Sequence, residues 1–304
     1  MAAWFERFDI LQAERLRDLT VKCDEPMCEH TTFRIGGNAR RFACPKSTEE
    51  LHTLLDLAEE AEIPFLVIGN GSNLLVSDSG IDKLVIYTGS IDQMQLLEGD
   101  RILAAAGVSL ARLAVFAKNH ALTGLEFAHG IPGSLGGAVC MNAGAYGGDM
   151  SQVITEVTAW LPDRGVCTLT AQEADLSYRH SYFSNHRGVV LSAVMQLKTG
   201  SEEEIRAQME ELIRRRREKQ PLEFPSAGST FKRPEGHFAG ALIEQCGLKG
   251  VGIGGAEVSE KHAGFVINKG GATCSDVLRL IEKIRADVLE KTGVSLEPEI
   301  KMVD

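Results

Sequence analysis

The sequence has no hydrophobic run long enough to cross a membrane and no excess of positive charge. Its 304 residues carry a formal net charge of −10 at pH 7, and no apolar stretch approaches the ~18 residues of a membrane-spanning helix. An acidic chain has no general attraction for nucleic acid or an anionic membrane, so an anionic substrate would need a locally basic pocket. The N-terminal residues lack the apolar segment of a secretory signal. We therefore expect a cytoplasmic protein with no nucleic-acid partner and no membrane insertion.

Paired metal-ligand spacings are missing as well. The seven cysteines are an odd number and are scattered along the chain, which is typical of reduced thiols in a cytosolic protein. Cys23, Cys28 and His30 lie close together in sequence. Structural zinc, however, needs four ligands in paired spacings, and the chain offers no second pair. We expect no bound metal.

The chain also lacks the two common phosphate-binding signatures, GxGxxG and GxxxxGK[ST], that run directly into a helix. Two other glycine-rich segments are present. Residues 69–73 follow an apolar run at 65–68 that is typical of a buried strand. In 124–148, eight glycines are interleaved with apolar residues, which argues against a solvated linker.

Glycine has no Cβ and tolerates positive φ, so these segments let backbone N–H groups close on a ligand, above all on phosphate oxygens. We interpret them as two phosphate cradles in which loop amides, and not a helix terminus, hold the anion. The alternative that the residues leave open is a series of tight turns between buried strands.

Hydrophobic periodicity and capping signals divide the chain into three parts. A capping box at 47–50 predicts a helix inside an N-terminal β-α-β unit. Short strands dominate from 84 to 197, with one helix at 109–120, and a boundary near 199–200 follows. Capping signals at Ser201 and Thr273 open two further helices. The other expected elements are strands at 40–44, 65–68, 84–87, 102–105, 153–161, 166–170, 189–197, 264–267 and 294–302 and a short helix at 239–246.

Six motifs, taken in order, resemble those of the UDP-N-acetylenolpyruvoylglucosamine reductase family. They lie at 35–39, 68–75, 130–138, 178–181, 227–232 and 296–300. The resemblance covers nearly the whole chain. It implies an α+β fold in which a two-part FAD-binding domain of the PCMH (vanillyl-alcohol-oxidase-like) type, residues 1–86 and 87–199, precedes a smaller α/β substrate-binding domain, residues 200–304.

The resemblance also implies an activity. A family member reduces UDP-N-acetylglucosamine enolpyruvate to UDP-N-acetylmuramate in peptidoglycan precursor synthesis, with non-covalently bound FAD as cofactor and NADPH as co-substrate. We expect a monomer. The motifs assign FAD contacts to Gly69, Asn70, Gly71, Ser72, Asn73, Leu74, Gly130, Ile131, Pro132, Gly133, Ser134, Gly136, Gly137 and Ala138. No segment matches the tyrosine-bearing loop of the family's longer class, so the chain resembles the shorter class.

Substrate contacts are expected at Tyr178, Lys219, Lys232, His262 and Asn268. Tyr178 is a candidate to cover the substrate in place of the missing loop, by stacking or hydrogen bonding. Lys219 follows an arginine-rich helix end and lies where the chain turns toward Ser229, so it could offer a charge to a substrate phosphate. His262 and Asn268 are expected to support the site without taking part in the chemistry.

The catalytic trio implied by the family is Arg179, Ser229 and Glu299. Spacing alone does not choose between Glu297 and Glu299, which share one face of the expected strand; the family pattern selects Glu299. In the family, hydride passes from nicotinamide to flavin and then to the enolpyruvyl ether. Arg179 would neutralise the substrate carboxylate, protonated Glu299 would donate a hydrogen bond to the enolate, and Ser229 would protonate the carbanion.

The residues leave three other functions open. Ser229 with His237 or His262 suggests a hydrolase, but the serine lacks the GxSxG elbow. A different flavin oxidoreductase on the same binding domain is a second possibility, and a catalytically silent binder or regulator of nucleotide sugars is a third.

Overall fold

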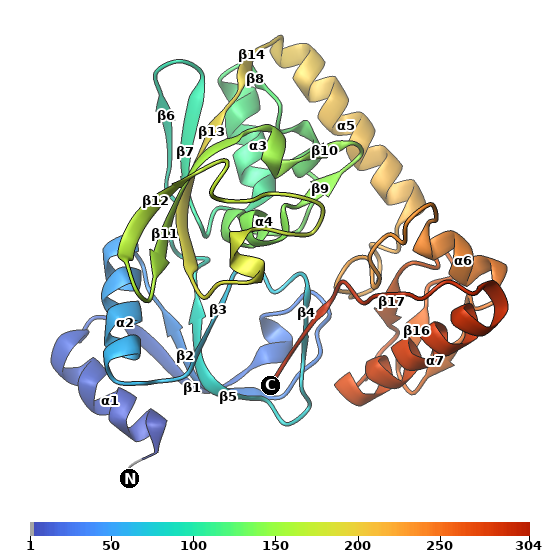
Figure 1. The fold of residues 1–304 in the computed structure, drawn as a ribbon, viewed down its shortest axis with the longest axis horizontal. Coiled ribbons are helices and arrows are strands. Elements are labelled where there is room, and N and C mark those ends of the chain that lie inside the picture. The colour runs from blue at the N-terminus through green and yellow to red at the C-terminus, as the bar shows by residue number, and fades with distance from the viewer. Residues whose placement is uncertain (1–2) are drawn as a thin grey trace. The chain divides into compact units, whose positions relative to one another are not determined.

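The chain forms two compact units in the computed structural model, which describes residues 3–304 (Figure 1). Unit 1 consists of Met1–Cys23, Arg41–Asn70 and Lys83–Arg215, and unit 2 of Asp24–Arg40, Gly71–Asp82 and Arg216–Asp304. The C-terminal part of the chain therefore shares its unit with two short segments from the N-terminal third.

A four-stranded sheet contains the first strands of the chain in the order β1-β2-β5-β3. Its strands are β1 (Thr20–Pro26), β2 (Asn38–Cys44), β3 (Phe65–Ile68) and β5 (Ile81–Tyr87). Helix α2 (Thr48–Glu60) connects β2 to β3, as the predicted β-α-β unit requires, but β5 lies between these two strands and pairs in parallel with β3. The predicted cap is confirmed, because the Ser47 hydroxyl accepts a hydrogen bond from the Glu50 amide at 3.1 Å.

Unit 1 also contains an antiparallel five-stranded sheet in the order β12-β11-β13-β7-β6. Its strands are β6 (Met94–Leu97), β7 (Arg101–Ala105), β11 (Ile154–Leu161), β12 (Gly165–Thr170) and β13 (Val189–Gln196). Helix α3 (Leu110–Asn119) begins after the predicted cap Ser109, and α4 (Leu135–Met141) packs on β13 and β7. The apolar faces of these elements form the core of the unit, which includes the fully buried Trp160.

The second glycine-rich segment runs into a helix, because α4 begins directly after Ser134. This differs from the interpretation that loop amides, and not a helix terminus, line both cradles. Gly136 and Gly137 have low helix propensity, so packing decides the conformation. A Cβ on Gly136 would lie 3.0 Å from the Ala106 Cβ, and only glycine allows α4 to approach the sheet this closely. The first glycine-rich segment is followed by strand β4 (Leu74–Val76).

Several short elements complete unit 1. Helix α1 (Trp4–Arg15), for which the sequence offered no prediction, buries Phe8. The remaining elements are the pairs β8 (Leu122–Thr123) with β14 (Lys198–Thr199) and β9 (Gly144–Ala145) with β10 (Gly148–Asp149), and the 3-10 turns η2 (Glu126–Ala128), η3 (Met150–Gln152) and η4 (Tyr182–Ser184). Helix α5 (Glu202–Lys219) then carries the chain into unit 2.

Unit 2 is built on helix α7 (Cys274–Thr292), which packs against β15 and β16 and contacts α6. Its predicted cap is confirmed by reciprocal bonds between Thr273 and Asp276, and Gly293 ends it with φ 74°. The other elements are η1 (Met27–Glu29), α6 (Ala239–Gln245), β15 (Gly252–Ile253), β16 (Ala256–Val258), β17 (Val266–Asn268) and β18 (Lys301–Val303).

The prediction of a strand at 294–302 is wrong for most of its length. Only β18 is regular, and it pairs in parallel with β4. Pro298 forms an isolated bridge with Phe231 instead of continuing a ladder, and proline has no N–H to donate to one.

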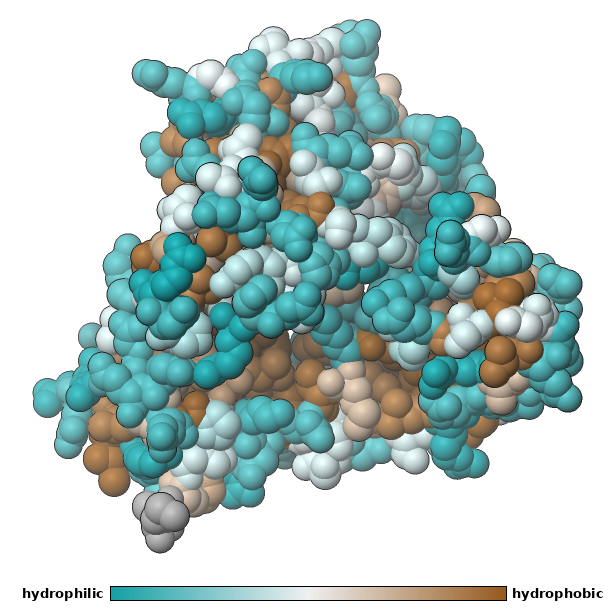
Figure 2. Space-filling model, in the orientation of Figure 1, coloured by the Kyte–Doolittle hydropathy of each residue, from teal (hydrophilic) through white to brown (hydrophobic). Residues whose placement is uncertain are grey.

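The surface is largely hydrophilic on the face shown in Figure 2. Within residues 3–304, no helix has the length and apolar character needed to cross a membrane. In the same residues, no group of three or more His, Cys, Asp or Glu side chains has the geometry to hold a metal ion.

Candidate active site

The two glycine-rich segments meet inside unit 1. The Asn70 side-chain amide donates a hydrogen bond of 3.3 Å to the Pro132 carbonyl. Gly69 faces Ser134 so closely that a Cβ on Gly69 would lie 2.0 Å from the serine Oγ. Glycine is therefore required at position 69, and the start of the first segment lies against the 130–138 segment.

Ser134 provides an unsatisfied polar atom at this meeting point. The residue is 2% exposed and occupies the N-cap of α4, yet its side chain makes no capping bond. Its Oγ is buried and has no hydrogen-bond partner among the described residues. A buried polar group without a partner costs about 1–3 kcal/mol. A ligand oxygen or hydroxyl here would remove that cost, so the residues present fit a phosphate-bearing cofactor.

The rest of the first glycine-rich segment belongs to unit 2. Gly71, with φ 59°, lies against the His30 carbonyl, where a Cβ would approach to 2.1 Å. The Asn73 side chain donates to the Glu299 carbonyl at 3.2 Å, and the Lys301 amide donates to the Asn73 carbonyl at 2.9 Å. Asn73 therefore fixes the backbone on which Glu299 lies.

Ser229 and Glu299 lie on adjacent segments of unit 2. The Glu299 amide donates to the Thr230 carbonyl at 2.8 Å, and the Lys232 amide donates to the Glu297 carbonyl at 2.9 Å. Ser229 itself is half-buried. The backbone bonds bring together two residues that are far apart in the sequence.

Buried contacts of Thr230 hold the Ser229 segment in place. Thr230 is 2% exposed. Its amide donates to the Gly264 carbonyl at 2.9 Å, and its Oγ1 accepts from the Val266 amide at 2.9 Å. Gly228, on the other side of the serine, has φ 78°, a conformation that favours glycine. Ser229 thus lies between a glycine turn and an immobilised threonine.

The structure distinguishes Glu297 from Glu299, which the spacing could not. The Glu297 side chain is 70% exposed and forms an ion pair of 2.5 Å with Lys232 Nζ. Lys232, expected to contact substrate, is therefore already paired with a carboxylate on the neighbouring irregular segment. Glu299 is less exposed than Glu297.

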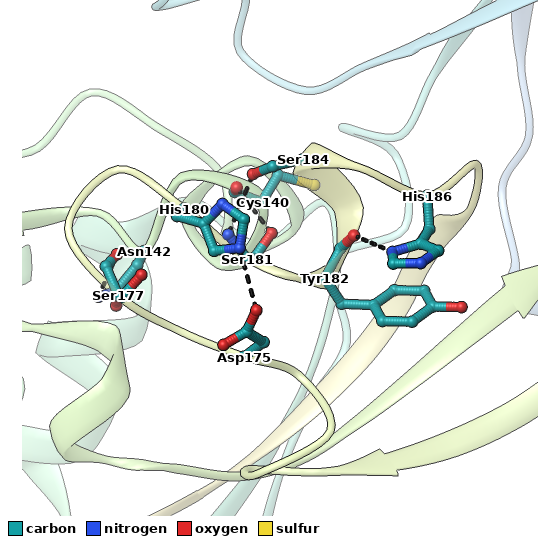
Figure 3. A network of polar contacts seen from close by, with 9 residues as sticks. All are labelled: Cys140, Asn142, Asp175, Ser177, His180, Ser181, Tyr182, Ser184 and His186. Atoms are coloured by element: carbon teal, nitrogen blue, oxygen red, sulfur yellow. Dashed lines mark hydrogen bonds and ion pairs between the residues drawn. The ribbon is translucent and has the colours of Figure 1, made fainter.

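Arg179 belongs to unit 1, where it forms the second corner of a tight turn. The amide and carbonyl groups of Ser177 and His180 pair with each other, both bonds being 3.1 Å. Arg179 has φ 54°, in the left-handed region that costs a residue with a Cβ about 1–2 kcal/mol. Its guanidinium lies 5.3 Å from the ring centroid of Tyr178, which is 57% exposed. Figure 3 shows the polar side chains around this turn.

The remaining expected substrate residues differ in their surroundings. Asn268 is 8% exposed, and its amide donates to the Phe33 carbonyl at 3.2 Å and accepts from Gly270 at 2.9 Å and from Ala272 at 3.2 Å. Its polar atoms therefore stabilise loops of unit 2. Lys219 is exposed at the end of α5.

His262 is half-buried, and burial lowers the pKa of its imidazole. Its Nδ1 accepts a hydrogen bond of 3.1 Å from the Gly264 amide, which requires that nitrogen to be unprotonated. The ring is therefore neutral and supports the backbone beside Thr230.

Two residues that the sequence did not single out surround the Arg179 turn. Both side chains are buried. Asn142 donates a hydrogen bond to the Ser177 carbonyl of the turn, and Ser181 donates one to the Cys140 carbonyl of α4. The left-handed preference of asparagine was the only local signal at Asn142, and nothing in the sequence pattern marked its partner.

Two family models match this chain. The family model described as FAD binding domain matches residues 39–170, and the model described as UDP-N-acetylenolpyruvoylglucosamine reductase, C-terminal domain, matches residues 220–303.

The relatives named UDP-N-acetylenolpyruvoylglucosamine reductase include two bacterial proteins that match nearly the whole chain. The protein of Caldanaerobacter subterraneus subsp. tengcongensis is 51% identical over 290 residues, which cover 95% of this chain and 96% of the relative. That of Syntrophomonas wolfei is 49% identical over 298 residues, 98% of each chain. Among solved structures, UDP-N-acetylenolpyruvylglucosamine reductase from Thermus caldophilus matches with a TM-score of 0.79 and 33% identity, covering 94% of this chain and 99% of that one.

Proposed function

This chain belongs to the family of UDP-N-acetylenolpyruvoylglucosamine reductases, and from that membership we propose how its residues carry out the family's reaction. The protein is a FAD-dependent UDP-N-acetylmuramate dehydrogenase that uses NADPH and acts in peptidoglycan precursor synthesis. Its fold is a PCMH-type FAD-binding domain followed by the family's C-terminal domain. We assign flavin binding to residues 1–86 and 87–199 and substrate binding to 200–304, in a cytoplasmic monomer.

The 69–74 and 130–138 segments hold the FAD diphosphate in this proposal. The unpartnered, buried Ser134 Oγ supports it, because the atom needs a polar ligand group. Gly69 supports it as well, since a side chain there would collide with Ser134 and block the approach of the two segments. When bound, the flavin supplies the hydride chemistry, and the protein supplies position and electric field.

Ser229 is the general acid. Reduction of the enolpyruvyl double bond puts negative charge on the carbon next to the carboxylate, and that carbon must be protonated. A serine hydroxyl is a weak acid in water, so its usefulness here depends on being held beside a strongly basic carbon. The anchoring of Thr230 and the turn at Gly228 give Ser229 such a fixed position.

Arg179 and Glu299 stabilise the charge that precedes protonation. The planar fork of Arg179 binds the substrate carboxylate in a bidentate manner. Glu299, when protonated, donates a hydrogen bond to the enolate oxygen. The single observation that best supports this assignment is the 2.8 Å bond from the Glu299 amide to the carbonyl of Thr230, because it ties the backbone of Glu299 to the residue that follows Ser229.

Substrate recognition is assigned to Tyr178, Lys219 and Lys232, with Asn268 and His262 as supports. The two lysines offer positive charge to the diphosphate of the nucleotide sugar. Tyr178, exposed beside Arg179, offers a ring and a hydroxyl near the reacting carboxylate.

The absorbance spectrum of purified protein tests the function directly. We expect a flavin spectrum that NADPH bleaches under anaerobic conditions and that UDP-N-acetylglucosamine enolpyruvate then restores, with UDP-N-acetylmuramate as product. A bleached flavin that the enolpyruvyl sugar nucleotide does not reoxidise would indicate a different flavin oxidoreductase. A flavin that NADPH does not bleach would indicate a silent nucleotide-sugar binder.

A further inference from the structure

The turn that carries Arg179 is tied to helix α4 on both sides by two buried side chains, Asn142 and Ser181. Ser177 and His180 close the turn, and Arg179 stands at its second corner with φ 54°. Because an arginine does not favour this conformation, the surrounding contacts must hold it. Figure 3 shows that these contacts come from the end of α4.

Asn142 holds the first side of the turn. The residue is 3% exposed, and its Nδ2 donates a hydrogen bond of 3.0 Å to the Ser177 carbonyl (Figure 3). Its Oδ1 accepts a bond of 2.9 Å from the Ser151 amide. Since only the oxygen can accept from an N–H, the second bond fixes the orientation of the side-chain amide. The nitrogen is thereby directed at the carbonyl that begins the turn.

Ser181 holds the second side. It is completely buried, and its Oγ donates a hydrogen bond of 2.8 Å to the Cys140 carbonyl (Figure 3). That carbonyl is among the last four of α4, which have no partner within the helix. The serine thus satisfies a helix end and fixes the backbone two residues after Arg179. The ion pair between His180 and Asp175 is more exposed, with side chains 30% and 70% accessible, and contributes less.

Helix α4 therefore connects two functional parts of unit 1. Its first residue follows Ser134 in the glycine-rich segment, and its last turn holds the Arg179 turn. Seven helical residues span only about 10 Å.

We propose that Asn142 is a positioning residue for the reaction. Through the Ser177 carbonyl it holds Arg179 in its left-handed conformation and so directs the guanidinium at the substrate carboxylate. The inference rests on the proposed role of Arg179. Ser181 acts in the same way from the other side of the turn.

Asn142→Asp removes the donor to the Ser177 carbonyl at nearly the same side-chain volume. Aspartate tolerates the left-handed φ of 40° found at position 142 and keeps an oxygen for the Ser151 amide. It also places a carboxylate in a site that is 3% exposed, which carries a desolvation cost, so the uncharged variant Asn142→Gly is measured beside it. Asn185→Asp is the matched control, because it adds the same charge at an exposed asparagine close to the turn.

The test measures the two half-reactions separately under anaerobic conditions. For Asn142→Asp we expect FAD content and reduction by NADPH within about twofold of wild type. Reoxidation by the enolpyruvyl sugar nucleotide should slow by about 10- to 100-fold, since small misplacements cost rates of this order. Adding Asn142→Asp to Arg179→Lys should slow reoxidation no further, because both changes remove one interaction. Asn185→Asp should behave as wild type.

Other outcomes overturn the proposal. Equal slowing of both half-reactions, or full additivity with Arg179→Lys, would mean that Asn142 does not act through the arginine. If Asn142→Asp loses flavin, Asn142→Gly, which also accepts the left-handed backbone, must give the expected pattern; loss of flavin in both variants would mean that Asn142 serves only the fold. If Arg179→Lys alone leaves reoxidation fast, the proposed role of the arginine fails. If Arg179→Lys is slow and both Asn142 variants are fast, only the positioning inference fails.

Discussion

The backbone amide of Glu299 donates a 2.8 Å hydrogen bond to the carbonyl of Thr230. Thr230 follows Ser229 directly, so this bond sets the spacing between the proposed proton donor and the proposed enolate stabiliser. Thr230 is anchored independently by Gly264 and Val266. Unit 2 therefore holds these two chemical groups on a common backbone support, which leads to specific expectations for their variants.

Ser229→Ala should separate the two half-reactions. Flavin reduction by NADPH needs no proton from the serine, and we expect its rate to stay within about twofold of wild type. Protonation of the substrate carbon loses its general acid, so reoxidation by the enolpyruvyl sugar nucleotide should slow by about 10²- to 10⁴-fold. Stopped-flow absorbance of the flavin measures both rates. Ser275→Ala, at an exposed serine of unit 2, is the control, and equal damage to both half-reactions would refute the assigned role.

Arg179→Lys should be severe although the charge is retained. An ammonium group cannot reproduce the bidentate geometry of the guanidinium, and loss of one oxyanion contact costs about 10²- to 10³-fold in rate. We expect such a fall in kcat for the enolpyruvyl substrate, measured by steady-state kinetics at saturating NADPH. Arg164→Lys, at an arginine in the β11–β12 turn, should have no effect. A wild-type kcat for Arg179→Lys would remove the arginine from the mechanism.

Gly69→Ala should impair flavin binding. The new Cβ would lie 2.0 Å from the Ser134 Oγ, so one of the two glycine-rich segments must shift. Overpacking of this kind costs about 1–3 kcal/mol, and the displaced segments no longer fit the diphosphate. The FAD content per chain after purification measures the effect. Gly99→Ala is the control for the loss of a glycine, because no atom lies within 4 Å of the added Cβ, although Gly99, unlike Gly69, has positive φ; its flavin content should remain normal.

Protonation of the buried His262 imidazole should lower the stability of the protein in mild acid. Burial, the largest cause, and Lys249 both lower the pKa of the imidazole in the folded state, while Glu244 and the histidine's backbone oppose the shift. The unfolded chain therefore binds a proton at a higher pH than the folded chain, and stability falls as the pH drops below the unfolded pKa of about 6.5.

Urea unfolding at pH 7.5 and pH 5.5 measures this effect. His262→Asn keeps an acceptor for the Gly264 amide but does not titrate, so it should lose less stability between the two pH values than wild type. His237→Asn, at an exposed histidine of the same unit, should lose as much as wild type. An unchanged pH dependence in His262→Asn would show that the buried imidazole is not responsible.

Lys232→Met should weaken substrate binding more than it weakens the fold. The ion pair with Glu297 is partly exposed, with side chains 33% and 70% accessible, and such pairs contribute about 0.2–1 kcal/mol. A double-mutant cycle with Glu297→Gln in urea unfolding should give a coupling in that range. If Lys232 binds the diphosphate, Lys232→Met raises KM for the nucleotide sugar at nearly constant kcat, whereas Glu297→Gln does not. An unchanged KM in Lys232→Met would exclude the lysine from substrate binding.

Local sequence signals were enough to predict the helices whose ends carry capping residues. Ser47, Ser109, Thr273 and Gly293 mark helix ends where a side chain or a glycine satisfies the backbone, and each such end agrees with the structure. Strands with clear apolar patterning, such as β11 and β13, were equally visible. Two elements could not be predicted from local signals. Helix α4 contains two adjacent glycines, and its packing on β13 and β7 stabilises the helical conformation. The segment before β18 is irregular because Pro298 interrupts it.

The sequence by itself determined the family, the glycine-rich segments and the residue types that the chemistry needs, because these depend on local composition and on motifs in a fixed order. Spacing alone could not tell the surroundings of Glu297 and Glu299 apart, and it did not reveal the contacts of Asn142 and Ser181 or the orphaned Ser134 hydroxyl. Those depend on contacts between residues distant in the chain: Lys232 pairs with Glu297, Asn142 reaches Ser177, and Ser134 faces Gly69. Tertiary structure decided them, because hydrogen bonds and burial act through distances in space, which the order of residues along the chain does not contain.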